Sequence, residues 1–161
     1  MASLSFPALL TTGKPFLKAL EQHHALAVYA PLEGGFEGRY LRRLRTKGYR
    51  VVSMTARGLG DLESYLNGVH GVRPPHLGKK NVGKEASVGP VYFVPPILSC
   101  RLGELTGKER GVVLWLVEGQ VLSKQERTYL INLTVGEPKF KVVLEMGGGR
   151  SFGYKPLAEV V

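Results

Sequence analysis

Two glycine-rich segments have residue types that could bind a phosphate: residues 32–38 (LEGGFEG) and 78–84 (GKKNVGK). The first lies between a predicted strand and a predicted helix, as a dinucleotide-binding loop would. Its glycines have the wrong spacing, however, and its two glutamates would repel a pyrophosphate. The second matches the first seven positions of a P-loop, but Glu85 stands where Ser or Thr would bind Mg²⁺. We interpret the first as a tight turn and expect no nucleotide hydrolysis at the second.

The residues that could bind a metal or act as a nucleophile form no convincing set. His23 and His24 are adjacent, so on a helix they diverge and cannot both coordinate one ion. His70 and His76 lie in a segment with four cationic residues, which would repel a metal ion. Cys100 follows an apolar segment and is interpreted as a buried small hydrophobe, although a Cys–His nucleophile stays open as an alternative.

Positive charge is the most distinctive property of the chain. There are 22 Lys and Arg residues against 13 Asp and Glu, which gives a formal net charge of +9. The excess is concentrated in residues 39–57 and 73–84. A solvated face is one interpretation; the sharper one is a docking surface for an acidic partner, because the planar guanidinium of Arg pairs well with carboxylates. The candidate interface residues are Arg39, Arg42, Arg43, Arg45, Arg57, His70, Arg73, His76, Lys79 and Lys80.

A free-standing basic nucleic-acid-binding module is the main alternative function. The predicted basic helix carries Phe36 and Tyr40 on its apolar face, so these rings are not interleaved with the arginines as base-stacking platforms. No RNA- or DNA-binding signature is visible either. A small nucleotide-dependent enzyme that uses residues 78–84 is a weaker third alternative.

The elements that would position these residues alternate between strand and helix. Hydrophobic periodicity predicts helices over residues 15–24, 36–47, 61–66 and 123–133, the last with a Ser123–Glu126 capping box. Strands are predicted over residues 25–32, 49–55, 90–95, 111–117 and 139–146. The result is an α/β fold: a single layered domain over residues 1–161, with a mixed sheet of about five strands and three or four helices. One long basic loop (residues 70–89) and a short flexible N-terminus (residues 1–10) complete it.

Composition limits the function further. A single cysteine excludes an internal disulfide framework, and an iron–sulfur cluster or Cys-based zinc site held by this chain alone. The longest apolar stretches, residues 91–98 and 112–117, are far shorter than the roughly 18 residues of a spanning helix. The N-terminal residues lack the basic start and long apolar run of a secretory signal, so none is expected.

Several long runs of this sequence resemble one known family. ALAVYAPLEGGFEGRYLRRLR, TARGLGDLESYL and GVHGVRPPHLGKK, followed by VGPVYFVPPI, GVVLWLVEGQVLSKQE and KVVLEMGG, resemble subunit N of the NAD(P)H–quinone oxidoreductase of cyanobacteria and chloroplasts. The resemblance extends over about residues 10–157.

The resemblance implies an accessory subunit in the hydrophilic arm of a complex that resembles respiratory complex I. Such a complex couples electron transfer to plastoquinone with proton translocation, and serves cyclic electron flow, respiration and carbon concentration. The implied chain has no catalytic site and no cofactor of its own; Fe–S clusters and plastoquinone would be bound by other subunits. Its implied partners are other subunits of the arm, with ferredoxin nearby and no nucleic acid. It would lie on the cytoplasmic (or stromal) side of the thylakoid membrane, attached only through the complex.

Overall fold

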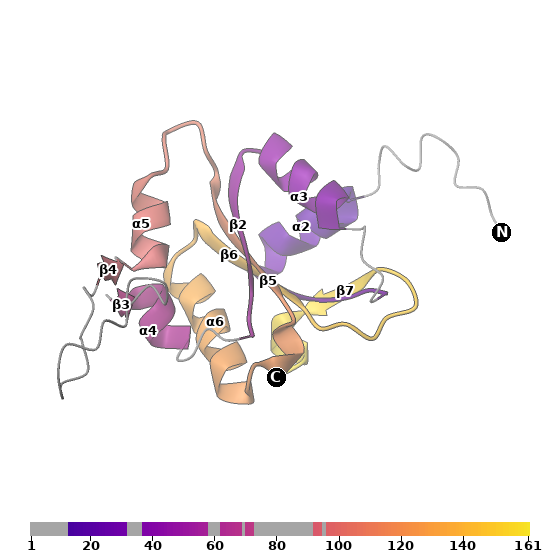
Figure 1. Ribbon diagram of the computed structural model, residues 1–161. Helices are drawn as coiled ribbons and strands as arrows, with labels where there is room; N and C mark the ends of the chain where they lie inside the picture. The colour runs from indigo at the N-terminus through magenta and orange to yellow at the C-terminus, as the bar shows by residue number, and fades with distance from the viewer. Residues whose placement is uncertain (1–12, 32–36, 58–61, 69, 73–91, 95) are drawn as a thin grey trace, which may run out of the picture.

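A twisted five-stranded sheet forms the centre of the molecule (Figure 1). The computed structural model describes residues 13–31, 37–57, 62–68, 70–72, 92–94 and 96–161. In spatial order the strands are β2 (Tyr49–Thr55), β5 (Gly111–Val117), β6 (Phe140–Glu145), β1 (Ala25–Tyr29) and β7 (Gly153–Pro156). The first four run parallel and β7 is antiparallel to β1. This confirms the predicted α/β class and the mixed sheet of about five strands.

Helices cover both faces of the sheet, so the fold has three layers. On one face lie α2 (Lys14–His23) and α3 (Glu37–Thr46). On the other lie α4 (Leu62–Asn67), α5 (Ile97–Gly103) and α6 (Lys124–Gly136). Figure 1 shows the two groups on opposite sides of the strands. Two 3₁₀ turns, η1 (Gly119–Val121) and η2 (Leu157–Glu159), complete the described elements.

The central strands are buried on both faces, as expected for parallel strands between helical layers. Successive side chains of a strand point to opposite faces, so β5 supplies both halves of the core. Leu114 and Leu116 pack under α4, α5 and α6, whereas Val113 and Trp115 pack under α2 and α3. The Trp115 indole is fully buried, and its Nε1–H donates to Glu145 at 2.6 Å.

Two differences from the predicted elements have physical reasons. The predicted strand over residues 90–95 is present as β4 (Tyr92–Val94), but it pairs in a separate two-stranded sheet with β3 (His70–Val72). The predicted loop over residues 70–89 was therefore wrong at its start, which pairs as a strand. The fifth strand of the main sheet is therefore β7, which is short and half-exposed and gives a weak hydrophobic signal. A fifth helix, α5, follows Pro96, although its sequence ILSCRLG has little helical periodicity.

Local signals determine where two helices end or begin. Gly48, after α3, has φ +96°, the left-handed conformation in which glycine commonly ends a helix. Ser123 caps α6 by accepting a hydrogen bond from the Glu126 backbone N–H at 3.2 Å. The N-cap predicted at Ser123 is thereby confirmed, and the Ser123 hydroxyl in turn donates to the Glu126 carboxylate at 3.1 Å. Among the described helices, none combines the length and the apolar character that a bilayer crossing requires.

Candidate interaction surface

Helix α3 presents most of the predicted basic residues to solvent. Tyr40 and Leu44, one turn apart, are buried against the sheet with exposed fractions of 6% and 1%. With 3.6 residues per turn, the residues between and beside them project outward. Arg39, Arg42 and Arg45 are accordingly exposed, whereas Arg43 is half-buried. The periodicity therefore predicted the orientation of this helix correctly.

The neighbouring helix α2 extends this positive surface. Phe16 of α2 meets Tyr40 of α3 edge-on, with ring centroids 5.1 Å apart. Lys14 and Lys18 lie on the exposed side of α2, opposite its buried Phe16, Leu17 and Leu20. Sequence analysis missed these two lysines because α2 is separated from α3 in the chain by a strand. We call the exposed cations of these two helices the basic face: Lys14, Lys18, Arg39, Arg42 and Arg45.

The charges of the basic face are not neutralised within the part of the chain that the structure describes. The five ion pairs found among the described residues involve none of its members. Glu21, which lies on α2, is bound instead by Arg110, whose guanidinium donates to it at 2.9 Å. Five exposed like charges thus lie on two helices that pack together, an arrangement that attracts an anionic partner.

The remaining predicted site residues are not part of the basic face as described. Arg57 follows β2 at its carboxyl end. There it pairs with Glu118 at 2.5 Å. His70 begins β3, where the structure describes the backbone alone. Arg73, His76, Lys79 and Lys80 lie outside the described residues, as do residues 1–10, most of the glycine-rich turn and the P-loop-like segment.

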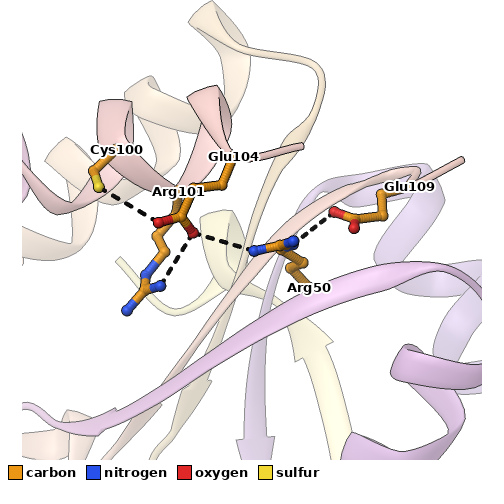
Figure 2. A network of polar contacts seen from close by, with 5 residues as sticks. All are labelled: Arg50, Cys100, Arg101, Glu104 and Glu109. Atoms are coloured by element: carbon orange, nitrogen blue, oxygen red, sulfur yellow. Dashed lines mark hydrogen bonds and ion pairs between the residues drawn. The ribbon is translucent and has the colours of Figure 1, made fainter. Parts of the chain in front are cut away.

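A polar network joins β2 to the connection between α5 and β5 (Figure 2). Arg50 donates to Glu104 at 3.1 Å and to Glu109 at 2.7 Å. Arg101 donates to the same Glu104 oxygen at 3.1 Å, and the Cys100 Sγ lies 3.8 Å from the other oxygen. The hydrogen bond and charge of Glu109 raise the pKa of Arg50. The network holds the end of α5 and the start of β5 against β2.

A second polar cluster lies where α2 ends and the parallel strands begin. Tyr49 donates to Glu21 at 3.1 Å, beside the Arg110–Glu21 pair. Lys141 is only 6% exposed; its ammonium donates to the Pro138 carbonyl at 3.2 Å and lies 5.4 Å from the Tyr49 ring centroid. Burial lowers the pKa of Lys141 and raises that of Tyr49.

His24 borders this cluster in an unusual backbone conformation. It ends α2 with φ +66°, and its Nδ1 is buried without a hydrogen-bond partner. Burial, and secondarily the charge of Lys141, lower its pKa. The sequence motifs gave no sign of this cluster, because its members come from four separate elements.

Within the described residues, no three His, Cys, Asp or Glu side chains come together as metal ligands would. Cys100 is exposed, which contradicts the expectation of a buried small hydrophobe, because it lies on the solvent side of α5. The polar groups of the two networks bind mainly one another. The basic face has the free charge, and it can attract and orient an acidic surface.

These features define a layered α/β protein whose principal candidate site is a cationic surface. Comparison with known proteins specifies the family. The profile of the family described as NADH-quinone oxidoreductase cyanobacterial subunit N matches residues 7–159. The chain belongs to this family.

Curated relatives agree with the family over nearly their whole length. A protein of Rippkaea orientalis named "NAD(P)H-quinone oxidoreductase subunit N" is 65% identical over 154 residues, which cover 96% of this chain and 98% of the relative. A Microcystis aeruginosa protein of the same name is 63% identical over 152 residues, covering 94% and 96%. One from Synechococcus elongatus is 59% identical, covering 95% and 97%. The resemblance stated from the sequence is thereby confirmed.

Proposed function

We propose that this chain is an accessory subunit of the hydrophilic arm of a cyanobacterial NAD(P)H–quinone oxidoreductase, in which it supports assembly and stability. Family membership and full-length similarity to proteins named as subunit N support its place in such a complex. The basic face carries the proposal for its role, because five outward-facing cations on two packed helices fit an acidic neighbour. Neither finding favours the nucleic-acid-binding alternative.

The chain contributes a binding surface to the complex, and the catalytic groups are on other subunits. Fe–S clusters and plastoquinone belong to those subunits, which transfer electrons to the quinone while protons are translocated. The described polar side chains support this division of labour. Arg50 is bound to two glutamates, Glu21 to Tyr49 and Arg110, and Glu145 to the Trp115 indole.

The site of action in this proposal is the cytoplasmic side of the thylakoid membrane, which the chain reaches through its partner subunits. Ferredoxin would approach the same arm as electron donor. The basic face is assigned to a stable contact within the complex and not to this donor.

The basic face is tested by comparing two triple variants in a strain that lacks the native chain. Arg39, Arg42 and Arg45 are replaced together by Ser in the first. The control replaces Lys108, Lys124 and Lys139 by Ser. These lysines are also exposed and make no described ion pair, so both variants lose three positive charges.

The proposal predicts less assembled complex, and less plastoquinone reduction by the membranes, with the α3 variant than with the control variant. Both isolated chains should melt at similar temperatures, because the replaced side chains are exposed. Equal amounts of complex with both variants would show that the basic face is not needed for assembly.

A further inference from the structure

The outer edge of strand β2 is long and regular for the edge of a sheet. Its seven residues, YRVVSMT, pair in unbroken register with β5 and contain neither proline nor a bulge. At the opposite edge, β7 has four residues and ends at Pro156. Exposed edges are usually shortened, kinked or covered, because they invite pairing with other chains. The β2 edge is neither shortened nor kinked, which points to a partner that covers it.

The backbone groups that face outward from β2 can be assigned. The Gly48 carbonyl accepts from Arg110 N–H at 2.8 Å, and the Ala56 N–H donates to the Val117 carbonyl at 2.8 Å. Because backbone groups alternate sides along a strand, the even-numbered residues of β2 face β5. Val51 and Ser53 therefore point their N–H and C=O groups away from the sheet. No strand among the described residues pairs with them.

On the α5 side, the β2 edge adjoins a small apolar hollow of about 10 Å³, room for about one water molecule. Its lining includes Val52 of β2 and Ile97, Leu98 and Arg101 of α5. Arg101 carries its charge toward Glu104, and the hollow presents no polar surface. A strand laid along β2 would place every second side chain on this face, where apolar side chains would cover the hollow and the half-buried Val52 and Ile97 beside it.

On the other side, the β2 edge adjoins α3. Arg43 of α3 lies against Gly13, toward α2, which packs on β1, β6 and β7. Arg43 therefore marks the side of α3 that faces α2. Residues two positions away from it on the helix point about 200° from it, so Leu41 and Arg45 lie on the flank of α3 away from α2. That flank adjoins the free edge of β2. The other set of side chains of an added strand would therefore meet the positive charge of Arg45.

We propose that the outer edge of β2 binds an extended segment of a neighbouring subunit, whose side chains alternate between apolar and acidic. The segment adds a sixth strand; its apolar side chains cover the hollow beside α5 and its acidic side chains pair with the α3 flank. This inference rests on the proposed function, because it takes the partner from the same complex. A second copy of this chain fits poorly, since it would bring together two chains of net charge +9 each and two copies of Arg45.

The test compares Ser53→Pro with Ser53→Ala in the native host. Ser53 is exposed, and its N–H points outward, so proline at this position removes an edge donor without removing a hydrogen bond to β5. Ser53→Ala removes the hydroxyl and keeps the N–H. Both tagged variants are purified from gently solubilised membranes, and the co-purified quinone oxidoreductase is quantified.

We expect at least about fivefold less complex to be recovered with Ser53→Pro than with Ser53→Ala, because the proline removes one interstrand hydrogen bond to the partner. Equal recovery would overturn the β2 inference and leave the proposed function standing. Failure of wild type and Ser53→Ala alike to recover the complex would instead contradict the proposed function.

Amide hydrogen exchange gives a second measurement that does not depend on a variant. In the isolated full chain, the Val51 and Ser53 amides should exchange rapidly, while Val52 and Met54, bonded to β5, exchange slowly. In the purified complex, exchange at Val51 and Ser53 should slow by about tenfold or more, with Val52 and Met54 as internal references. Unchanged exchange at Val51 and Ser53 in the complex would overturn the inference. A shift of the pure chain to a dimer would mean that a second copy occupies the edge.

Discussion

Gly111 shows how closely the backbone packs where β5 begins. A Cβ at this position would overlap the backbone carbonyl oxygen of Lys139, and Val112 N–H donates to that carbonyl at 2.8 Å. Gly111→Ala should therefore lower the free energy of unfolding by roughly 1–3 kcal/mol, because neither backbone can move without breaking the ladder. Chemical denaturation of the isolated chain measures this.

Gly136, the last residue of α6, provides the matched control. An added Cβ there meets no atom within 4 Å, so Gly136→Ala should leave the free energy of unfolding unchanged or raise it slightly. A Gly111→Ala chain as stable as Gly136→Ala would show that the approach between β5 and β6 is looser than described.

His24 makes stability depend on pH at the residue scale. Its folded-state pKa lies below the ordinary 6.5, so the unfolded chain binds a proton at a higher pH than the folded chain does. The free energy of unfolding should therefore fall as pH drops through about 6.5 toward the folded-state value. His24→Asn, which tolerates the left-handed backbone, should flatten this decline between pH 7 and pH 5. Identical profiles of stability against pH for the two chains would contradict the assignment of this decline to His24.

Sequence periodicity predicted which residues of α3 are exposed and which are buried, because the helix repeat alone determines this. It could not predict that Arg50 binds Glu104 and Glu109, which are 54 and 59 positions away. Nor could it place Lys141 against Tyr49. Such pairs depend on strand order, which separates neighbours in space from neighbours in sequence.

At the scale of elements, α6 depends on its N-terminal cap. Ser123→Ala removes the acceptor for the Glu126 N–H and should lower the free energy of unfolding by about 1 kcal/mol. Ser123→Asp supplies another acceptor and a charge suited to the helix N-terminus, so it should restore most of the loss. Thermal melts of the three chains measure the effect. If the Ser123→Asp chain melts at the same temperature as the Ser123→Ala chain, the loss of the cap is not the cause of the lower stability.

The elements that were predicted differently had weak or ambiguous local signals. The strands with continuous Val and Leu runs, β1, β5 and β6, were predicted because burial on both faces favours such sequences. β4 has a similar sequence, but which sheet it joins depends on its partner β3. β7 has a half-exposed pattern, and its place beside β1 comes from tertiary packing.

At the scale of the whole molecule, the sequence predicted the fold class and the family, and it indicated the three exposed arginines of the cationic surface on α3. The structure adds Lys14 and Lys18 to that surface by placing α2 beside α3. It places Arg57 apart from it, in a pair with Glu118. The basic face and the β2 edge, with which no described strand pairs, both adjoin α3, so neighbouring subunits can bind both without displacing any described element.

Affinity purification of the tagged chain from its native host tests the central claim most directly. Membranes are solubilised gently, and the co-purified proteins are identified and assayed for plastoquinone reduction. The account predicts recovery of the quinone oxidoreductase core subunits together with that activity. Recovery of the chain alone, or with nucleic acid, would contradict it.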